Sequence, residues 1–294
     1  MLQKRKRFTR VVIPVILILC IIPGIFMVKA DWTFTIKEHL LSGRQQVSMT
    51  EIQADSLDLS KYSVQKLKKM DNVRFDQSLM LINKDYKIDS DFEAAVSGYK
   101  DTGVSMNDCA ASSFEAMADD VKRKYGKDLL ISSAYRSRDQ QDAVYADAKY
   151  HDEAAKVDES EHQAGLALDL YVPEYAGSAF IKTPAGQYIN SKGFEYGFIL
   201  RYPPFKTSIT GIPYEPWHLR YVGQPHATYI YNNKLTLEEY ITSLVPGSFY
   251  ECREYIISRQ PKGKLLIPNG SYEIKISDDN TGHYIITAKK ISAA

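Results

Sequence analysis

The chain has 294 residues, of which 44% are hydrophobic and 25% are charged, and these values exclude a disordered or collagen-like protein. Its 37 Lys and Arg residues nearly balance 36 Asp and Glu residues, so it lacks the strong basic excess of a dedicated nucleic-acid binder, and we expect no nucleic-acid partner. Three cysteines are too few for a disulfide-rich scaffold.

The charges are unevenly distributed along the chain. Residues 1–30 contain six basic residues and no acidic one, which leaves 31 basic and 36 acidic residues, a net charge of −5, in 31–294. The basic cluster Lys4-Arg5-Lys6-Arg7 precedes Val11–Val28, eighteen residues without a charge, close to the roughly 20 that cross a bilayer. Basic residues before a span hold the N-terminus in the cytoplasm. We therefore predict a cytoplasmic stub and an uncleaved transmembrane anchor in 1–30; a signal peptide cleaved after Ala30 is the alternative.

The first part of the exported chain shows short apolar runs and one strong helix pattern. Residues 31–75 are predicted to form a stem with a short helix at Ile36–Leu41, and a strand is expected within Gln77–Ile88. Apolar side chains at spacings of three and four predict an amphipathic helix over Met106–Tyr125, closed by Gly126.

Two further elements follow before a less regular segment. Asp128–Ser133 is typical of a short buried strand, and Arg138–His151 of a helix with Asp139 in its first turn. Residues 160–223 are rich in Gly, Pro and aromatic residues, which indicates short strands between turns, and Leu235–Leu244 is expected to be helical.

The C-terminal part has a different composition after Pro246-Gly247 and predicts a small β-rich appendage. Its expected strands are Tyr250–Ser258, Lys264–Pro268, Tyr272–Ser277 and His283–Lys289. Cys109 and Cys252 lie in predicted apolar elements, and we expect two buried thiols rather than a disulfide.

Two segments contain residues typical of a metal centre. Ser160-Glu161-His162-Gln163-Ala164-Gly165-Leu166-Ala167-Leu168-Asp169 carries one imidazole and one carboxylate, and Tyr214-Glu215-Pro216-Trp217-His218 carries another of each. Catalytic zinc takes three protein ligands from His, Asp and Glu and leaves a fourth position for water. His162, Asp169 and His218 meet that requirement, with Asp169 delivered by a short strand. Taken singly, either segment is more often a structural hydrogen bond or a surface pair.

A carboxylate next to the predicted ligands could act as a base. Glu215 lies three residues before His218, so it can be close to the metal without binding it. A carboxylate in that position takes a proton from attacking water and delivers it to the leaving amine.

A third segment, Ser132–Gln141, lies at the junction of a predicted strand and helix. Arg136 offers a planar fork of donors that suits a carboxylate or an oxyanion, and Gln141 could supply a neutral donor beside it. The simpler interpretation of Arg136 alone is a surface ion pair.

Together these segments resemble one family. Over roughly Gln77–Leu244 the sequence is similar to the VanY-type D-alanyl-D-alanine carboxypeptidases, zinc peptidases of the LAS group (lysostaphin, D-Ala-D-Ala metallopeptidase, sonic hedgehog). Ser-x-His-x6-Asp, Glu-Pro-Trp-His and Tyr-Arg-Ser are all present and in the family's order, and strings such as Tyr196-Gly197-Phe198 and Arg220-Tyr221-Val222-Gly223 also look like the family.

The resemblance implies a role for each site residue and an α+β fold. It places one zinc ion on His162, Asp169 and His218 and makes Glu215 the catalytic base. Arg136 and Gln141 would hold the substrate's terminal carboxylate or carbonyl oxygen, and Ser160 and Trp217 would line the site. The implied fold is a small antiparallel sheet with flanking helices, in a catalytic domain at 76–245 that lies between the stem and the appendage at 246–294.

The implied activity is a serine-independent zinc D,D-carboxypeptidase on the outer face of a bacterial cytoplasmic membrane. It would remove the last D-alanine from peptidoglycan pentapeptide stems, in cell-wall remodelling or glycopeptide (vancomycin) resistance. An L,D-carboxypeptidase acting on tetrapeptide stems uses the same motifs and is the alternative within the enzyme class. From another class, the chain could be a zinc-containing wall-binding module without activity, although such a module needs neither Glu215 nor Arg136.

Overall fold

The computed structural model describes residues 30–41, 47–148 and 154–291. The predicted membrane span Val11–Val28 lies outside these ranges, and within them no helix is long and apolar enough to cross a membrane. The chain divides into two compact units, Met1–Gly43 and Arg44–Ala294. The described part of the first unit is helical, with α2 at Ala30–Ile36 and the π-helical η1 at Lys37–Leu41, which confirms the helix expected at Ile36–Leu41.

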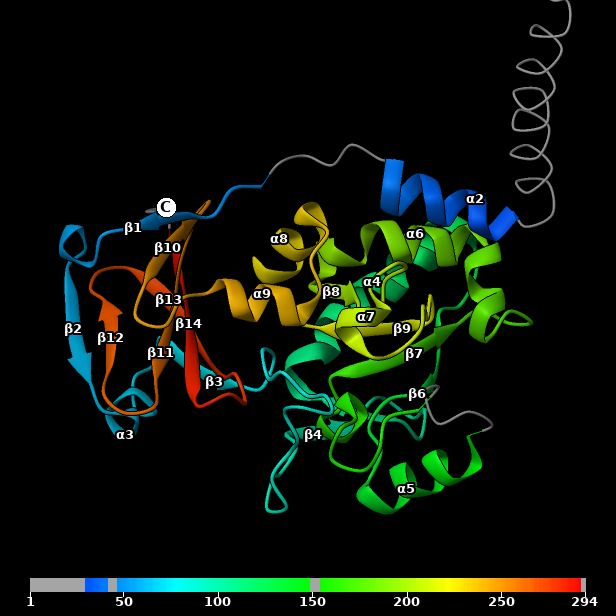
Figure 1. The fold of residues 1–294 in the computed structure, drawn as a ribbon, viewed down its shortest axis with the longest axis horizontal. Coiled ribbons are helices and arrows are strands. Elements are labelled where there is room, and N and C mark those ends of the chain that lie inside the picture. Colours follow the sequence, from blue (N-terminus) through cyan, green and yellow to red (C-terminus); the bar gives the residue numbers. More distant parts are fainter. Residues whose placement is uncertain (1–29, 42–46, 149–153, 292–294) are drawn as a thin grey trace, which may run out of the picture. The chain divides into compact units, whose positions relative to one another are not determined.

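A four-stranded antiparallel sheet lies at the centre of the catalytic part of the second unit. Its strands, in spatial order, are β6 (Leu130–Ser133), β7 (Ala167–Tyr171), β9 (His218–Tyr221) and β8 (Phe198–Leu200). The long helix α4 (Asp108–Tyr125) and α6 (Pro184–Lys192) contribute Phe114 and Ile189 to the core that covers one face of this sheet. Figure 1 shows β7 beside β9 with these helices near them. The predicted α+β fold, a small antiparallel sheet with flanking helices, is confirmed.

The alternation of side chains along β7 and β9 determines where polar groups gather. Leu168 and Leu170 on β7 and Leu219 on β9 belong to the core beneath α4 and α6. Successive side chains of a strand point to opposite faces, so Asp169 and His218 lie on the other face of the sheet.

Local sequence signals set the ends of the predicted helices. The Asn107 side chain accepts a hydrogen bond from the amide of Cys109 at the start of α4, and Gly126 ends α4 in the left-handed conformation, as predicted. Helix α5 (Arg138–Asp147) begins with a capping box on Ser137 and ends before Ala148, whose backbone is extended, so it is shorter than predicted; the remaining positions of the predicted range, 149–151, lie outside the described residues.

The other helices of this unit are short. They are α3 (Val64–Leu67), α7 (Thr207–Thr210), α8 (His226–Asn233) and α9 (Leu237–Ser243), together with the 3-10 turns η2 (Ala54–Ser56), η3 (Glu161–Ala164), η4 (Gly177–Lys182) and η5 (Gly193–Tyr196). Helix α9 confirms the prediction for 235–244. The expectation of only short strands and turns in 160–223 is wrong for α6, because Thr183 caps that helix and Pro184 occupies its first turn.

A second β structure contains strands from both ends of the unit. A six-stranded sheet has the order β1-β10-β11-β14-β13-β3, and β2 pairs with β12; β4 and β5 form a separate pair (Figure 1). The strands are β1 (Thr50–Ile52), β2 (Leu59–Tyr62), β3 (Val73–Asp76), β4 (Val96–Gly98), β5 (Ser105–Asn107), β10 (Phe249–Cys252), β11 (Tyr255–Pro261), β12 (Leu265–Pro268), β13 (Tyr272–Asp278) and β14 (His283–Lys290). The β-rich C-terminal appendage is present, but the predicted stem does not stand apart from it, because β1, β2 and β3 all pair with C-terminal strands.

The strand expected within Gln77–Ile88 is wrong, since the structure has no strand there. The apolar run is buried as predicted, but its backbone bonds to a mixture of side chains and isolated backbone groups, such as the carbonyl of Asp279, which accepts from Leu81 at 3.1 Å, and it forms no strand ladder. The amide of Leu79 donates to Ser277 Oγ at 2.9 Å, and the carbonyl of Met80 accepts from Arg220 Nη2 at 2.8 Å. An apolar run predicts burial, but it does not reveal which groups satisfy the backbone.

Both cysteines that the structure describes are free thiols, as predicted; Cys252 is buried, but Cys109 is only partly buried. The motifs assign no role to His226. It is buried, and its ring nitrogens lie 2.5 Å from Tyr240 Oη and 2.9 Å from Thr287 Oγ1.

Gly165 provides a test of the turn between η3 and β7. Its φ of +65° suits glycine, and an added Cβ would lie 2.5 Å from Val96 Cγ1 and 2.9 Å from the amide nitrogen of Asn107. Gly126 has almost the same φ, +64°, but open space around it. We predict that Gly126→Ala lowers the free energy of unfolding by about 1 kcal/mol, and Gly165→Ala by roughly 2–4 kcal/mol because overpacking adds to the strain. Urea denaturation measures both; equal losses would show that the close approach at Gly165 is unimportant.

Candidate active site

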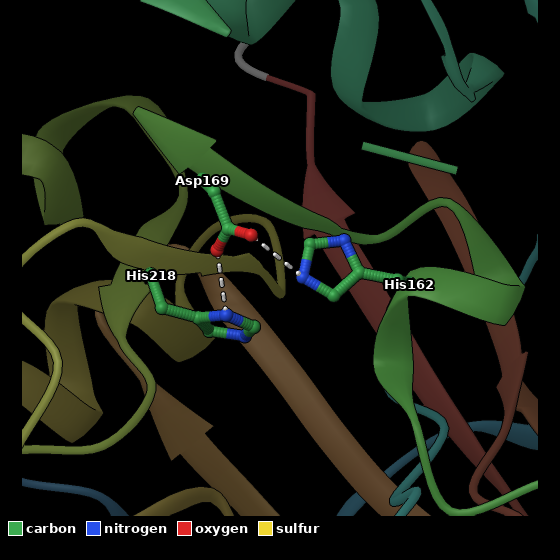
Figure 2. A group of neighbouring side chains, drawn as sticks. All are labelled: His162, Asp169 and His218. Carbon is green, nitrogen blue, oxygen red and sulfur yellow. Dashed lines mark hydrogen bonds and ion pairs between the residues drawn. The ribbon is translucent and has the colours of Figure 1, made fainter. Parts of the chain in front are cut away.

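Three predicted ligands meet on the face of the four-stranded sheet that points away from α4 and α6. Asp169 on β7 and His218 on β9 are paired directly across the two strands. His162 comes from η3, the short turn that precedes β7. One possible ligand atom from each residue lies within 4.8 Å of the others, and Figure 2 shows a carboxylate oxygen of Asp169 facing each ring.

The contacts within this cluster are short. His162 Nε2 lies 3.3 Å from Asp169 Oδ2, and His218 Nδ1 lies 2.9 Å from Asp169 Oδ1. The two imidazole rings are 5.0 Å apart between centroids and nearly perpendicular, at 83°. Both histidines are buried, whereas 16% of the surface of the Asp169 side chain is exposed to solvent. The cluster is therefore enclosed but reachable from one side.

The tautomer of His162 indicates that the cluster suits a cation. Its Nδ1 lies 2.6 Å from the carbonyl oxygen of Ala134, which can only accept, so Nδ1 carries the proton. In the neutral ring Nε2 then has a lone pair directed at a carboxylate oxygen of Asp169. Two acceptors 3.3 Å apart repel each other unless a positive charge lies between them.

The pKa shifts in this site agree with that requirement. Burial, with help from the charges of Arg136 and His218, lowers the pKa of His162 against the opposing effect of Asp169. Burial also acts to lower the pKa of His218, but the nearby carboxylates of Asp169 and Glu161 outweigh it and raise the pKa to about 9. The pKa of Asp169 is held well below its usual range, since its two histidines outweigh the effect of burial. A carboxylate between two imidazoles is a suitable donor set for a divalent metal.

Glu215 lies at the edge of the cluster. Its Oε2 is 3.6 Å from His218 Nδ1, and its side chain is 14% exposed. Its backbone amide donates to the carbonyl of Tyr202 at 3.3 Å, and the Tyr202 ring lies 4.8 Å from that of His218. The structure thus places this carboxylate beside the three ligands, as the motif spacing predicted.

Arg136 reaches the same cluster from the loop between β6 and α5. Its Nη1 lies 3.8 Å from Asp169 Oδ2 and donates to Ser133 Oγ at 2.8 Å, and its Nε donates to Gln141 Oε1 at 2.9 Å. Within the described ranges no hydrogen bond is formed by Nη2, so part of the guanidinium fork remains for another group. The surface ion pair considered for Arg136 is not what the structure shows, since the side chain is only 18% exposed.

The remaining predicted residues lie near the cluster without a described polar contact to it. Gln141 is fully buried; besides accepting from Arg136 it donates to the carbonyl of Ala155 at 2.6 Å. Ser160 is buried at the start of η3, and Trp217 packs against the main core one residue before His218. Their contacts with substrate stay predictions.

The structure adds two polar residues that the sequence analysis did not select. Ser133, opposite Asp169 in the β6–β7 pairing, orients Arg136. Glu161 is completely buried behind His218, where it binds Arg201 and Arg220. A sequence signal did exist for these charges, because both arginines lie beside short apolar strands where a charge needs a partner.

Comparisons with known proteins identify the family that this chain is similar to. The family model VanY, described as D-alanyl-D-alanine carboxypeptidase, matches residues 103–224. A D-alanyl-D-alanine carboxypeptidase of Enterococcus faecium is 34% identical over 238 residues, which cover 71% of this chain and 74% of that protein.

Two solved structures are also similar. The vancomycin resistance D,D-dipeptidase VanXYg, solved with a D-Ala-D-Ala phosphinate analogue, has a TM-score of 0.62 at 23% identity and covers 80% of this chain and 99% of its own; it shares the fold. The LD-carboxypeptidase LdcB has a TM-score of 0.51 at 34% identity, over 60% of this chain and 92% of its own. The fold and the family match define a carboxypeptidase, which confirms the predicted enzyme class. Within that class the chain belongs to the VanY family of D-alanyl-D-alanine carboxypeptidases, as its motifs predicted.

Proposed function

We propose that this protein is a zinc-dependent D,D-carboxypeptidase that removes the C-terminal D-alanine from peptidoglycan pentapeptide stems. The observation that carries the proposal is the meeting of His162, Asp169 and His218 within 4.8 Å, with Glu215 close to His218 and Arg136 close to Asp169. A wall-binding module would have no use for these last two groups beside a metal centre.

The donor set fits zinc in a catalytic role. Two imidazoles and one carboxylate are three protein ligands, which is the number that leaves a coordination position open. Zinc bound by His162, Asp169 and His218 would supply Lewis-acid polarisation of the scissile carbonyl and a more acidic water.

Glu215 is proposed to move the protons of the reaction. Its carboxylate lies next to the ligand cluster but is not one of the three converging groups. From this position it accepts a proton from the attacking water and then delivers it to the nitrogen of the departing D-alanine.

Arg136 is proposed to recognise the end of the substrate. Its guanidinium is fixed by Ser133 and Gln141 and lies on the cluster side of the sheet, 3.8 Å from Asp169. A fixed, planar fork binds a carboxylate through two parallel hydrogen bonds. Capture of the free C-terminus would place only the last peptide bond at the metal, which makes the enzyme an exopeptidase.

The stereochemistry of the substrate is the open point between two related activities. Membership of the VanY family favours the D,D reaction on pentapeptide stems. The 34% identity to an LD-carboxypeptidase favours the alternative, L,D cleavage of tetrapeptide stems. We propose the D,D reaction, and a contribution to glycopeptide (vancomycin) resistance, since glycopeptides bind stems that end in D-Ala-D-Ala.

We also propose a single-pass protein of the bacterial cytoplasmic membrane whose catalytic domain is extracellular. The support is the basic cluster Lys4-Arg5-Lys6-Arg7 followed by the uncharged Val11–Val28. This location would bring the enzyme to peptidoglycan precursors at the outer face of the cytoplasmic membrane.

The substrate proposal predicts that D-alanine is released from muramyl pentapeptide much faster than from muramyl tetrapeptide. EDTA should abolish release and added zinc should restore it, because the ligand cluster needs its metal. Chromatographic assay of free D-alanine measures both reactions. Faster release from the tetrapeptide would make the L,D alternative correct.

Carboxylate capture predicts that a pentapeptide with an amidated C-terminus is not hydrolysed. Arg136→Lys should lower kcat/KM for the free acid by about 10–100-fold, since a point charge replaces a bidentate fork. Unchanged cleavage of the amidated peptide would show that Arg136 does not bind the terminus.

The proton-transfer role predicts that Glu215→Gln keeps its zinc but loses about 10²–10⁴-fold in kcat. Metal content by atomic absorption and steady-state hydrolysis measure the two effects. Glu195→Gln is the control, because it removes a carboxylate that is 47% exposed and paired with Lys192. Loss of zinc from Glu215→Gln would instead identify Glu215 as a ligand.

A further inference from the structure

Glu161 is a buried anion whose position the proposed reaction does not use. It directly precedes His162 in η3, and its side chain has no exposed surface. One of its oxygens, Oε1, accepts from Arg201 Nε at 2.7 Å and from Arg220 Nη1 at 2.6 Å. Both arginine side chains are also fully buried, so three charged groups are packed together behind the metal-ligand cluster.

The second oxygen of Glu161 faces His218. Oε2 is buried without a hydrogen-bond partner, and so is Nε2 of His218. These two atoms lie 3.9 Å apart. A bridging water does not fit between them, because two hydrogen bonds of about 2.8 Å span more than 4 Å. A donor and an acceptor left unpaired in the interior are costly, and a movement of about 1 Å would join them.

We propose that Glu161 is a positioning residue that accepts a hydrogen bond from Nε2–H of His218 and thereby keeps Nδ1 of His218 free to bind the metal. Nδ1 is the nitrogen that faces Asp169 Oδ1, at 2.9 Å, so it is the one inside the cluster. His162 has the same arrangement with its nitrogens exchanged: Nδ1 donates to Ala134 and Nε2 faces the cluster. In each imidazole ring, an acceptor outside the cluster (Ala134 O for His162, Glu161 Oε2 for His218) binds the protonated nitrogen. The other nitrogen is then left unprotonated on the side of the metal.

The two arginines explain why Glu161 can do this as a fixed anion. Arg220 Nη2 donates to the carbonyls of Ser78 and Met80 at 3.0 and 2.8 Å, so its guanidinium is held from outside the site. Arg201 is held by Glu238 of α9, with hydrogen bonds of 3.0 and 2.6 Å. With Oε1 occupied by both arginines, Oε2 is directed at His218.

If Glu161 and Glu238 only stabilise the ion network, loss of either carboxylate should have the same effect on zinc binding. The positioning role separates Glu161 from Glu238, since only Glu161 touches the histidine. This inference rests on the proposed zinc site, so the wild-type protein must first bind zinc; if it does not, the proposed function fails before Glu161 is tested.

The test compares Glu161→Gln with Glu238→Gln in the full chain without a histidine tag. In Glu161→Gln the amide oxygen will face the two arginines, which need an acceptor, and its NH₂ will face His218. That reverses the hydrogen bond and favours the His218 tautomer with the proton on Nδ1. Competition with a chromogenic chelator should show zinc bound about 10–100-fold more weakly, as is usual when the partner of a metal-bound histidine is lost. Glu238→Gln should bind zinc like the wild type.

Equal weakening in both variants, or none in Glu161→Gln, would overturn the proposal. If Glu161→Gln does not fold, ¹⁵N NMR of histidine-labelled, zinc-loaded wild-type protein decides the question, with the His218 signal assigned by its loss in His218→Ala. A proton on Nε2 of His218 is the expected result, and a proton on Nδ1 would contradict the positioning role.

Discussion

The pairing of Asp169 with His218 across β7 and β9 is the constraint on which the rest of the site depends. Strand register places the two side chains on one face, and a shift of either strand by one residue would turn its member of the pair into the core beneath α4. The third ligand, His162, needs only the short turn η3 and the left-handed Gly165 to return to the same face. A carboxylate held between two imidazole nitrogens favours a positive charge, so the cluster suits a metal ion.

Behind this cluster lies a buried ion network with an unusual concentration of charge. Glu161, Arg201 and Arg220 are all fully buried, and Glu238 completes the group at the edge. Removal of one partner from such a group costs about 3–5 kcal/mol, whereas well-packed apolar residues in its place are often neutral. Fold stability alone therefore does not account for it. One member of the network, Glu161, faces His218, which agrees with the positioning role proposed for that residue.

Sequence patterns predicted the features that depend on local chemistry. The long helix α4 follows from periodic apolar positions with Asn107 and Gly126 at its ends. The motifs that contain His162, Asp169 and His218 predict the cluster that these three residues form. The predicted roles of Glu215 and Arg136 agree with where these side chains lie, although only experiment tests the roles themselves.

Features that depend on contacts between distant parts of the chain cannot be predicted from local sequence patterns. Nothing near Val73 shows that it pairs with Ile274, about two hundred residues away, so the predicted stem was separated from a sheet to which it belongs. The run at Leu79 has the composition of a strand, yet its amide bonds to Ser277. Arginines at short apolar strands indicate that a buried anion is needed, but only the fold identifies Glu161 as the partner of Arg201 and Arg220.

The central claim is that the three converging side chains hold one zinc ion. X-ray absorption at the zinc edge of the purified, metal-loaded protein tests this most directly. The account predicts one zinc per chain with nitrogen and oxygen ligands at about 2.0–2.1 Å, including the scattering pattern of two imidazoles. A sulfur ligand at about 2.3 Å, or no bound zinc, would contradict it.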